Sequence, residues 1–249
     1  MEEIRNKVKF GNVPTLPYAI EEAINRLRIN ISFLGRDVKK IMVISSEPNE
    51  GKSFISWHLW SQLARAGEKC LLIDGDMRNS TYGQKYAMER EDGKELKGIS
   101  HYLSGNVELD EVLMHTDNKN GDIMINVENV VNPSMLLEKK QFATLLEEVA
   151  KDYRYVFIDA PPLSLVSDGE LIGSYCDGAI LSVRSGVTPK SAVREAVSQL
   201  ERAGCPLLGI VLNRVGDSKS GYYHGRYGRY GHYGKYGGKY GEYYGTGSR

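Results

Sequence analysis

The chain alternates short, fully apolar runs with longer stretches in which apolar residues recur every three or four positions. The short runs, rich in Val, Ile and Leu, lie at residues 40–46, 69–74, 155–159, 178–183 and 206–213. The helix-length stretches lie at residues 53–66, 141–151 and 190–203. Apolar strands that alternate with helices are typical of a parallel sheet covered on both faces, so the pattern predicts an α/β fold.

Two further segments of the body carry weaker patterns. Residues 18–33, ahead of the first apolar run, predict an amphipathic helix. Residues 81–132 are more polar and weakly periodic, and predict short helices and loops.

Composition and charge exclude several classes of protein. Hydrophobic residues make up 41% and charged residues 26% of the chain, as in ordinary globular domains. Acidic and basic residues balance at 32 each, so the overall charge gives no sign of a nucleic-acid or lipid partner. The chain shows neither a membrane-spanning apolar run nor a secretory signal. Three cysteines in apolar stretches, Cys70, Cys176 and Cys205, predict buried reduced thiols in a cytosolic protein.

Residues 217–249 differ from the rest of the chain. They contain none of the aliphatic residues, Met, Phe, Trp or Cys, but hold 10 of the 27 glycines and 9 of the 16 tyrosines. Six Lys/Arg against two Asp/Glu give this segment a net charge of +4, which leaves −4 on residues 1–216. Such a segment buries too little surface to offset its ordering entropy, so we expect a flexible, mildly basic tail.

The first candidate for chemistry is the loop Ser-Glu-Pro-Asn-Glu-Gly-Lys-Ser at residues 46–53, between a strand and a helix. This turn directs backbone N–H groups and the helix dipole at a phosphate. Lys52 supplies charge for the β- and γ-phosphates, and the Ser53 hydroxyl can bind Mg²⁺. Ser46 stands where the usual P-loop pattern has glycine, and the alternative interpretation is a solvated turn with a surface lysine.

Carboxylates follow two of the predicted strands. Asp74 and Asp76 end the run at 69–74, and Asp159 ends the run at 155–159. Ligands of open α/β sheets bind at this carboxyl edge. Mg²⁺ that is held by phosphates needs only one or two protein carboxylates, for which Asp74 and Asp159 are the candidates. Any one of these residues could instead be a helix cap or a turn former, but three matched elements in this order favour a nucleotide site.

Four segments of the chain together resemble the motifs of the bacterial tyrosine kinases, and among them the CpsD/CapB type associated with capsule and exopolysaccharide. These segments are residues 45–53, 71–78 and 156–162 and the tyrosines of 222–244. The resemblance covers residues 18–249. It implies a P-loop NTPase-like α/β fold related to MinD and ParA, with a parallel sheet flanked by helices on both faces and a disordered Tyr/Gly-rich tail. The expected segments are a self-associating helical segment at 1–40, a kinase domain at 41–216 and an autophosphorylation tail at 217–249.

The resemblance also implies roles for individual residues. ATP would be held by Asn49, Glu50, Gly51, Lys52, Ser53, Phe54 and Asn213. Mg²⁺ would be anchored by Ser53, Asp74 and Asp159, and catalysis would depend on Lys52, Asp74, Asp76 and Asp159. The base that activates the phenol is either Asp74 or Asp76. Arg78 would steady this loop or the phosphates, and Asn213 is either an adenine ligand or a turn residue that ends its strand.

In the same way, the tail resembles the substrate of such a kinase, phosphorylated in trans by a neighbouring subunit. The expected acceptors are Tyr222, Tyr223, Tyr227, Tyr230, Tyr233, Tyr236, Tyr240, Tyr243 and Tyr244. The implied partners are further copies in a ring such as an octamer, a separate membrane activator of the polysaccharide co-polymerase class, and a cognate tyrosine phosphatase, with no nucleic acid. The implied location is the cytoplasm, at the inner face of the membrane when the activator recruits the kinase.

Two positions depart from the family pattern. Asn49 stands where the family often has glycine, and Asn tolerates a positive φ better than most residues. The family's self-assembly motif ExxRxxR reads here from Glu22 to Arg28, with Asn25 in place of the middle arginine. The sequence therefore supports the ATP site more strongly than it supports a ring.

Two rival hypotheses remain. A ParA- or MinD-like positioning ATPase would carry a lysine five places before Lys52, where this chain has Glu47. A tail of interleaved Arg, Gly and Tyr also suits single-stranded nucleic acid, although its charge of +4 predicts weak, salt-sensitive binding.

Overall fold

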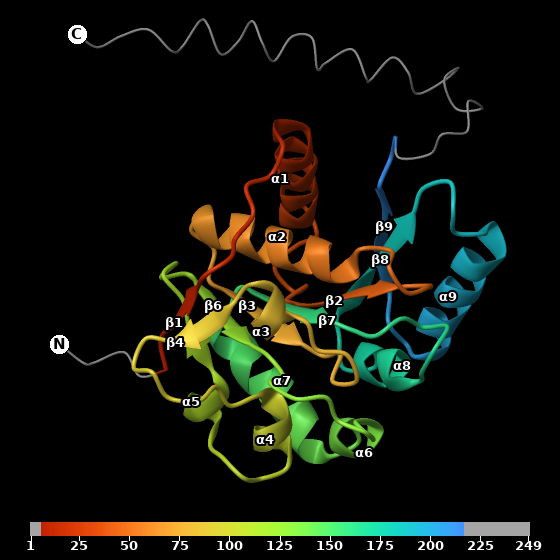
Figure 1. Ribbon diagram of the computed structural model, residues 1–249. Helices are drawn as coiled ribbons and strands as arrows, with labels where there is room; N and C mark the ends of the chain where they lie inside the picture. Colours follow the sequence, from red (N-terminus) through yellow and green to blue (C-terminus); the bar gives the residue numbers. More distant parts are fainter. Residues whose placement is uncertain (1–5, 217–249) are drawn as a thin grey trace, which may run out of the picture.

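A seven-stranded sheet forms the centre of the computed structural model, which describes residues 6–216 (Figure 1). Its strands are β2 Lys40–Ser45, β3 Cys70–Asp74, β5 Met114–His115, β6 Gly121–Met124, β7 Tyr155–Asp159, β8 Gly178–Arg184 and β9 Leu207–Asn213. They lie in the order β5-β6-β3-β7-β2-β8-β9. All neighbours pair in parallel except β5, which is antiparallel to β6 at one edge.

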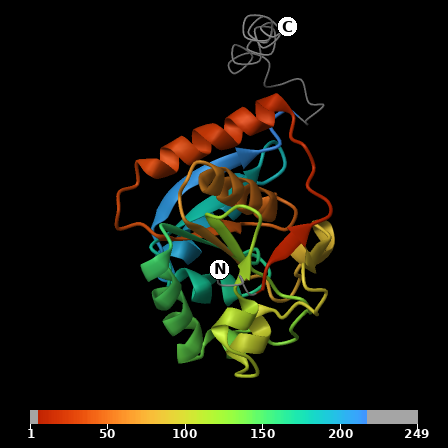
Figure 2. The ribbon, with the colours of Figure 1, turned by 90° about the vertical axis from the view of Figure 1, so that its left-hand side faces the viewer.

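Helices cover both faces of this sheet. One face carries α2 Lys52–Arg65, on whose outer side α1 Tyr18–Ser32 packs (Figures 1 and 2). The opposite face carries α7 Lys140–Asp152, α8 Asp168–Gly173 and α9 Lys190–Arg202. The short helices are α3 Tyr82–Lys85, α4 Ile99–Leu103, α5 Leu109–Val112 and α6 Ser134–Leu137. The predicted P-loop-type α/β architecture is therefore confirmed.

Two apolar cores explain why the strands are hydrophobic throughout. Along β2, Ile41 and Val43 pack beneath α2, whereas Met42 and Ile44 face α7, α8 and α9. Successive side chains of a strand point to opposite faces, so a strand between two layers of helices must be apolar at every position. The sequence pattern therefore located the central strands to within two residues.

The prediction for residues 81–132 was incomplete. The short helices α3, α4 and α5 are present, but β4 Met88–Arg90, β5 and β6 were not predicted. Strand β4 pairs with β1 Val8–Phe10, and β6 joins the main sheet beside β3. Strand β6 was hard to recognise because its buried Asp122 looks polar in the sequence. His115 Nδ1 lies 2.9 Å from one oxygen of Asp122, and the Tyr153 hydroxyl donates to the other at 2.5 Å.

Two smaller expectations concern the described residues 6–216. Cys70, Cys176 and Cys205 are buried and free, as predicted. Within the same range, no helix combines the length and the hydropathy needed to cross a membrane.

Replacement of Phe142 by Ala tests the importance of the core beneath α7. Phe142 is fully buried, so Phe142→Ala is expected to lower the free energy of unfolding by about 3–5 kcal/mol. Phe33→Ala is the matched control, because Phe33 is 79% exposed and its loss is expected to cost less than about 0.5 kcal/mol. Urea denaturation of the two variants measures both values, and equal losses would contradict this description of the core.

Candidate nucleotide and catalytic site

The phosphate loop connects β2 to α2 through two residues in the left-handed conformation. Asn49 has φ of 62° and Gly51, which caps α2, has φ of 92°. Asparagine tolerates this conformation through its short polar side chain, which explains how Asn49 replaces a glycine. The loop and the first turn of α2 line a cleft of about 1260 Å³, to which Asn49, Gly51, Lys52, Ser53 and Phe54 all contribute.

Glu50 holds the loop from inside the protein. Its side chain is buried, and its carboxylate accepts hydrogen bonds from the Ser46 hydroxyl at 2.9 Å and the Glu47 N–H at 3.0 Å. The Thr188 hydroxyl donates to its other oxygen. The Glu50 side chain therefore shapes the loop, while the residues on either side of it face the cleft.

Asn213 anchors the same loop from the end of β9. Its side-chain amide donates to the Glu50 carbonyl at 2.9 Å, and its own oxygen accepts the Arg214 N–H at 2.8 Å. A Cβ atom on Gly51 would lie 2.0 Å from this amide nitrogen, so any other residue there would have to displace the Asn213 side chain. Asn213 also lines the cleft.

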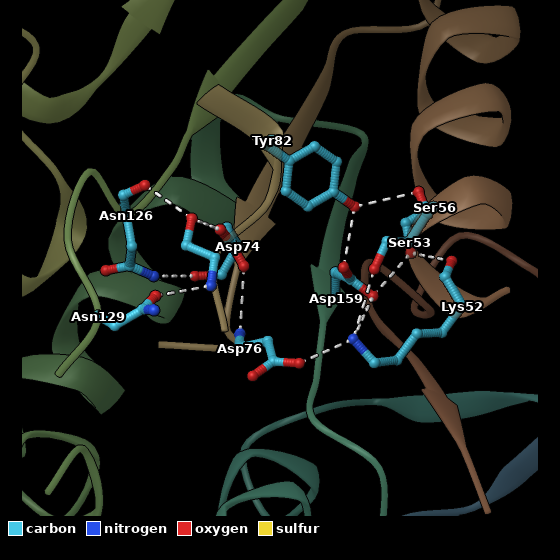
Figure 3. A network of polar contacts seen from close by, with 10 residues as sticks. Lys52, Ser53, Ser56, Asp74, Asp76, Tyr82, Asn126, Asn129 and Asp159 are labelled. Carbon is cyan, nitrogen blue, oxygen red and sulfur yellow. Dashed lines mark hydrogen bonds and ion pairs between the residues drawn. The ribbon is translucent and has the colours of Figure 1, made fainter. Parts of the chain in front are cut away.

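Lys52 lies among three carboxylates at the carboxyl edge of the sheet (Figure 3). Its ammonium is 2.9 Å from Asp76 Oδ2 and 3.7 Å from Asp159 Oδ1. Asp74 lies beneath them, where one oxygen accepts the Ser80 hydroxyl at 2.6 Å and the other accepts the Asp76 N–H at 3.2 Å. The structure thus brings together all four residues that were predicted to be catalytic.

Burial disfavours the ionised forms of the carboxyl groups in this cluster. Burial, reinforced by the nearby charge of Asp159, raises the pKa of Asp74 to about 8. Burial likewise raises the pKa of Asp159, although Lys52 partly offsets the effect. Burial lowers the pKa of Lys52, but the three carboxylates outweigh it and raise that pKa overall. The carboxylates therefore exceed the positive charge available to them within the protein.

The arrangement fits a magnesium ion that is held jointly with phosphates. The Ser53 hydroxyl lies 3.4 Å from the Lys52 ammonium, beside Asp159, and the buried Asp74 and Asp159 carboxylates lack a full counter-charge. In residues 6–216, no three His, Cys, Asp or Glu side chains converge to form a metal site of their own. Mg²⁺ seldom needs such a cage, since it is bound through one or two carboxylates and substrate phosphates.

Several residues that support the cluster were not predicted from the sequence. The Asn126 amide donates to the Asp74 carbonyl at 2.8 Å, the Ser56 hydroxyl lies 3.4 Å from Asp159 Oδ1, and the Tyr82 hydroxyl donates to Asp159 Oδ2 at 3.0 Å. None of them stands in a recognisable motif. Their positions depend on contacts between segments that are distant in the sequence.

Arg78 steadies the loop after β3. Its guanidinium donates to both oxygens of Asp168, at 2.6 and 3.2 Å, and the Ser134 hydroxyl donates to the same carboxylate at 2.6 Å. This bidentate pair fastens the end of β3 to the start of α8. Arg78 was expected to steady either this loop or the phosphates, and this geometry supports the contact with the loop.

Comparisons with known proteins show the family of the chain. A family described as an AAA domain matches residues 38–185. The tyrosine-protein kinase CpsD of Streptococcus agalactiae is 37% identical over 202 residues, which cover 81% of this chain and 86% of the relative. The chain belongs to the CpsD-type bacterial tyrosine-protein kinases. The kinase domain of the Escherichia coli tyrosine kinase ETK superimposes with a TM-score of 0.71 at 26% identity, covering 84% of this chain and 86% of that domain.

The fold of this CpsD-type kinase is shared more widely. MinD from Pyrococcus horikoshii, a septum site-determining protein solved with Mg-ADP, superimposes with a TM-score of 0.62 at 20% identity. The matched region covers 73% of this chain and 72% of MinD. This likeness concerns the fold alone. At the position that separates the rival hypotheses, a Glu47 carboxylate oxygen accepts the Ser164 hydroxyl at 3.0 Å.

The nine expected phosphorylation sites, Tyr222 to Tyr244, lie outside the described residues.

Gly51→Ala tests the close approach of Asn213 to the phosphate loop. Gly35→Ala is the matched control, because Gly35 has nearly the same φ, 89°, but nothing within 4 Å of an added Cβ atom. Both variants incur backbone strain of about 1–2 kcal/mol. Gly51→Ala is expected to lose at least about 1 kcal/mol more, because the Cβ atom displaces the Asn213 amide. Chemical denaturation measures the difference, and equal losses would show that the loop has room to adjust.

Asp74→Asn tests the electrostatic cost of the cluster in the nucleotide-free protein. The pKa of this carboxyl is about 8 in the folded protein and near ~3.9 in an unfolded chain, so folding favours its protonated form. The contribution of Asp74 to the stability of the wild type is therefore expected to fall as the pH rises from about 4 to 8. The melting temperature of Asp74→Asn relative to wild type should rise across this window. The exposed Asp110→Asn should show no such trend.

Proposed function

We propose that the chain binds ATP with Mg²⁺ and transfers the γ-phosphoryl group to tyrosines in residues 217–249 of a neighbouring copy. The observation that carries the proposal is the cleft lined by Lys52, at the start of α2, and Asp76, with the buried Asp159 3.7 Å from the Lys52 ammonium. Phosphoryl transfer depends mainly on positioning and charge neutralisation, which this arrangement supplies. The membership of the tyrosine-kinase family and the nine tyrosines of the tail support a phenolic acceptor.

The bound phosphates would take over the Lys52 ammonium. Backbone N–H groups at the start of α2 and the helix dipole attract the β- and γ-phosphates. Lys52, now 2.9 Å from Asp76, would turn to these phosphates and leave the Asp76 carboxylate without its partner. Ser53, Asp74 and Asp159 would hold Mg²⁺, which supplies positive charge to the transferring group when it is bound. ATP binding would therefore activate Asp76 in the same step that fixes the nucleotide.

Asp76 is the stronger candidate for the base. It lines the cleft, whereas Asp74 does not. Both oxygens of Asp74 already accept hydrogen bonds from Ser80 and from the Asp76 N–H. In the proposed step, the phenol transfers its proton to the Asp76 carboxylate while its oxygen forms the new bond to the γ-phosphorus. The bond between the γ-phosphorus and the β–γ bridging oxygen breaks, and ADP leaves.

We further propose that phosphorylation regulates assembly. Each phosphate adds about −1.5 to −2 charges, so three or four reverse the +4 of the tail and weaken its attraction to a body of charge −4. A ring such as an octamer would use α1, where Asn25 Oδ1 accepts hydrogen bonds from Arg28 at 2.9 and 3.0 Å. Asn25 thus orders Arg28 within the helix, although it cannot itself form the ion pairs of an arginine.

The proposed setting is capsule or exopolysaccharide synthesis and export at the inner face of the cell membrane. A membrane activator of the polysaccharide co-polymerase class would recruit the kinase, and a cognate tyrosine phosphatase would reverse its action. The exposed apolar side chains Tyr18 and Ile20 on α1 offer a surface for such contacts, beside the cleft. This setting is supported by the membership of the CpsD-type kinases, one relative of which is named as a putative tyrosine-protein kinase in the cps region of Klebsiella pneumoniae.

The central experiment incubates the protein with ATP and Mg²⁺, together with its activator, and maps phosphotyrosine by mass spectrometry. Lys52→Met is expected to lose at least about 100-fold in tail labelling, since it removes the charge that binds the phosphates. Lys94→Met, at a side chain that is 75% exposed, is the matched control and should label normally. Labelling that survives in Lys52→Met, or a wild type that never acquires phosphotyrosine, would refute the proposed function.

A mixing experiment tests transfer in trans. A variant with all nine tail tyrosines changed to Phe keeps its active site but has no acceptor, whereas Lys52→Met keeps the acceptors. Neither should label alone, and their mixture should label the tail of Lys52→Met. Failure of the mixture, with a fully active wild type, would show that each chain phosphorylates itself.

A further inference from the structure

Tyr82 is the first residue of α3, and its side chain extends through the protein interior to Asp159. The residue is 1% exposed, and its hydroxyl lies 3.0 Å from Asp159 Oδ2 and 3.2 Å from the Ser53 carbonyl oxygen. A phenol has one proton, so it donates to one of these acceptors at a time, and the closer, charged acceptor is Asp159 Oδ2. The Tyr82 hydroxyl thus lies between the end of β7 and the first turn of α2 (Figure 3).

The two oxygens of Asp159 have different neighbours. Oδ2 accepts the Tyr82 hydroxyl, while Oδ1 lies 3.7 Å from the Lys52 ammonium and 3.4 Å from the Ser56 hydroxyl. Rotation of a carboxylate about its last side-chain bond is soft, so a single strong donor decides which oxygen faces which way. Tyr82 thus turns Oδ1 toward Lys52 and the phosphate loop.

An aromatic stack prevents Tyr82 from moving away. Its ring stacks on Tyr86 at a centroid distance of 6.1 Å, and Tyr86 in turn stacks on Trp57 of α2 at 3.6 Å. The Tyr82 phenol carries its proton at neutral pH, as any tyrosine does, and is therefore a donor to Asp159. Because its hydroxyl is enclosed behind Asp159, Tyr82 is not offered as a phosphate acceptor to another copy.

We infer that Tyr82 is a positioning residue, which fixes the rotation of Asp159 so that one carboxylate oxygen stays available to Mg²⁺·ATP beside Lys52 and Ser53. This inference rests on the proposed function. Hydrogen bonds from a second layer of residues commonly orient the groups that hold a metal, and their loss typically costs about 10- to 100-fold in metal affinity. The nearby Ser56 hydroxyl lies 3.4 Å from Oδ1 but only 2.9 Å from the Lys52 carbonyl, so the Tyr82 hydroxyl is the stronger donor to Asp159.

Tyr82→Phe tests this role, with Tyr86→Phe as the matched control. Both tyrosines are buried and stack on each other, but the Tyr86 hydroxyl has no hydrogen-bond partner among the described residues. Calorimetry measures ATP binding in EDTA and then the Mg²⁺ concentration that gives half-maximal tightening. Tyr82→Phe should leave the binding in EDTA unchanged and raise that Mg²⁺ concentration about 10-fold. Tyr86→Phe should change neither quantity.

A double-mutant cycle provides a readout that needs neither metal nor activity. In EDTA, the shifts in melting temperature of Tyr82→Phe and Asp159→Ala should not add in the double variant, because each substitution removes the hydrogen bond between the Tyr82 hydroxyl and Asp159 Oδ2. The shifts of Tyr86→Phe and Asp159→Ala should add. Should Tyr82→Phe fail to fold, 3-fluorotyrosine at position 82 keeps the ring and the hydroxyl and changes only its donor strength, and it should still shift the Mg²⁺ dependence.

The outcomes separate this inference from the proposed function. A wild type that binds no Mg²⁺·ATP and acquires no phosphotyrosine would refute the proposed function and this inference with it. An active wild type in which Tyr82→Phe and Tyr86→Phe have equal Mg²⁺ dependence and equal additivity would overturn the positioning role alone.

Discussion

One buried ammonium group facing three carboxylates is the constraint on which the site depends. Lys52 cannot neutralise Asp74, Asp76 and Asp159 together, and burial removes the water that would otherwise solvate them. Neutral groups of the surrounding chain donate hydrogen bonds to these carboxylates. The Ser80 hydroxyl and the Asp76 N–H donate to Asp74, and the Tyr82 hydroxyl donates to Asp159. The cluster is thus held in place by hydrogen bonds while it still lacks positive charge, which suits it to attract a cation and a nucleotide.

The sequence predicted those parts of the protein whose signals are local. The apolar strands, the phosphate loop and the two strand-end aspartates could be recognised because parallel strands bring their carboxyl ends to one edge. Strands β1, β4 and β6 could not, because they are short and their pairing joins distant segments. Tyr82 lies 77 positions from Asp159, and Thr188 lies 138 positions from Glu50. Such contacts follow from tertiary packing, which a pattern of neighbouring residues does not encode.

The comparison with MinD shows how little the fold alone decides. The two proteins share the architecture of the sheet and its helices, and the likeness extends no further. Features of the individual chain therefore have to distinguish its function from that of other proteins with this fold. One is Glu47, whose carboxylate accepts the Ser164 hydroxyl. Another is the set of nine tyrosines in residues 217–249, which are the acceptors in the proposed function.

Asn213 gives the end of β9 a mechanical significance. Its amide contacts the carbonyl of Glu50 in the phosphate loop, and only three residues separate Asn213 from the tyrosine-rich segment. Asn213 is also paired with Arg184 of β8, and its carbonyl accepts the Ser185 N–H at 2.9 Å. The place where the chain leaves the sheet is therefore tied both to the sheet and to the phosphate loop. In the proposed function, the acceptor segment would start from this fixed point, beside the cleft.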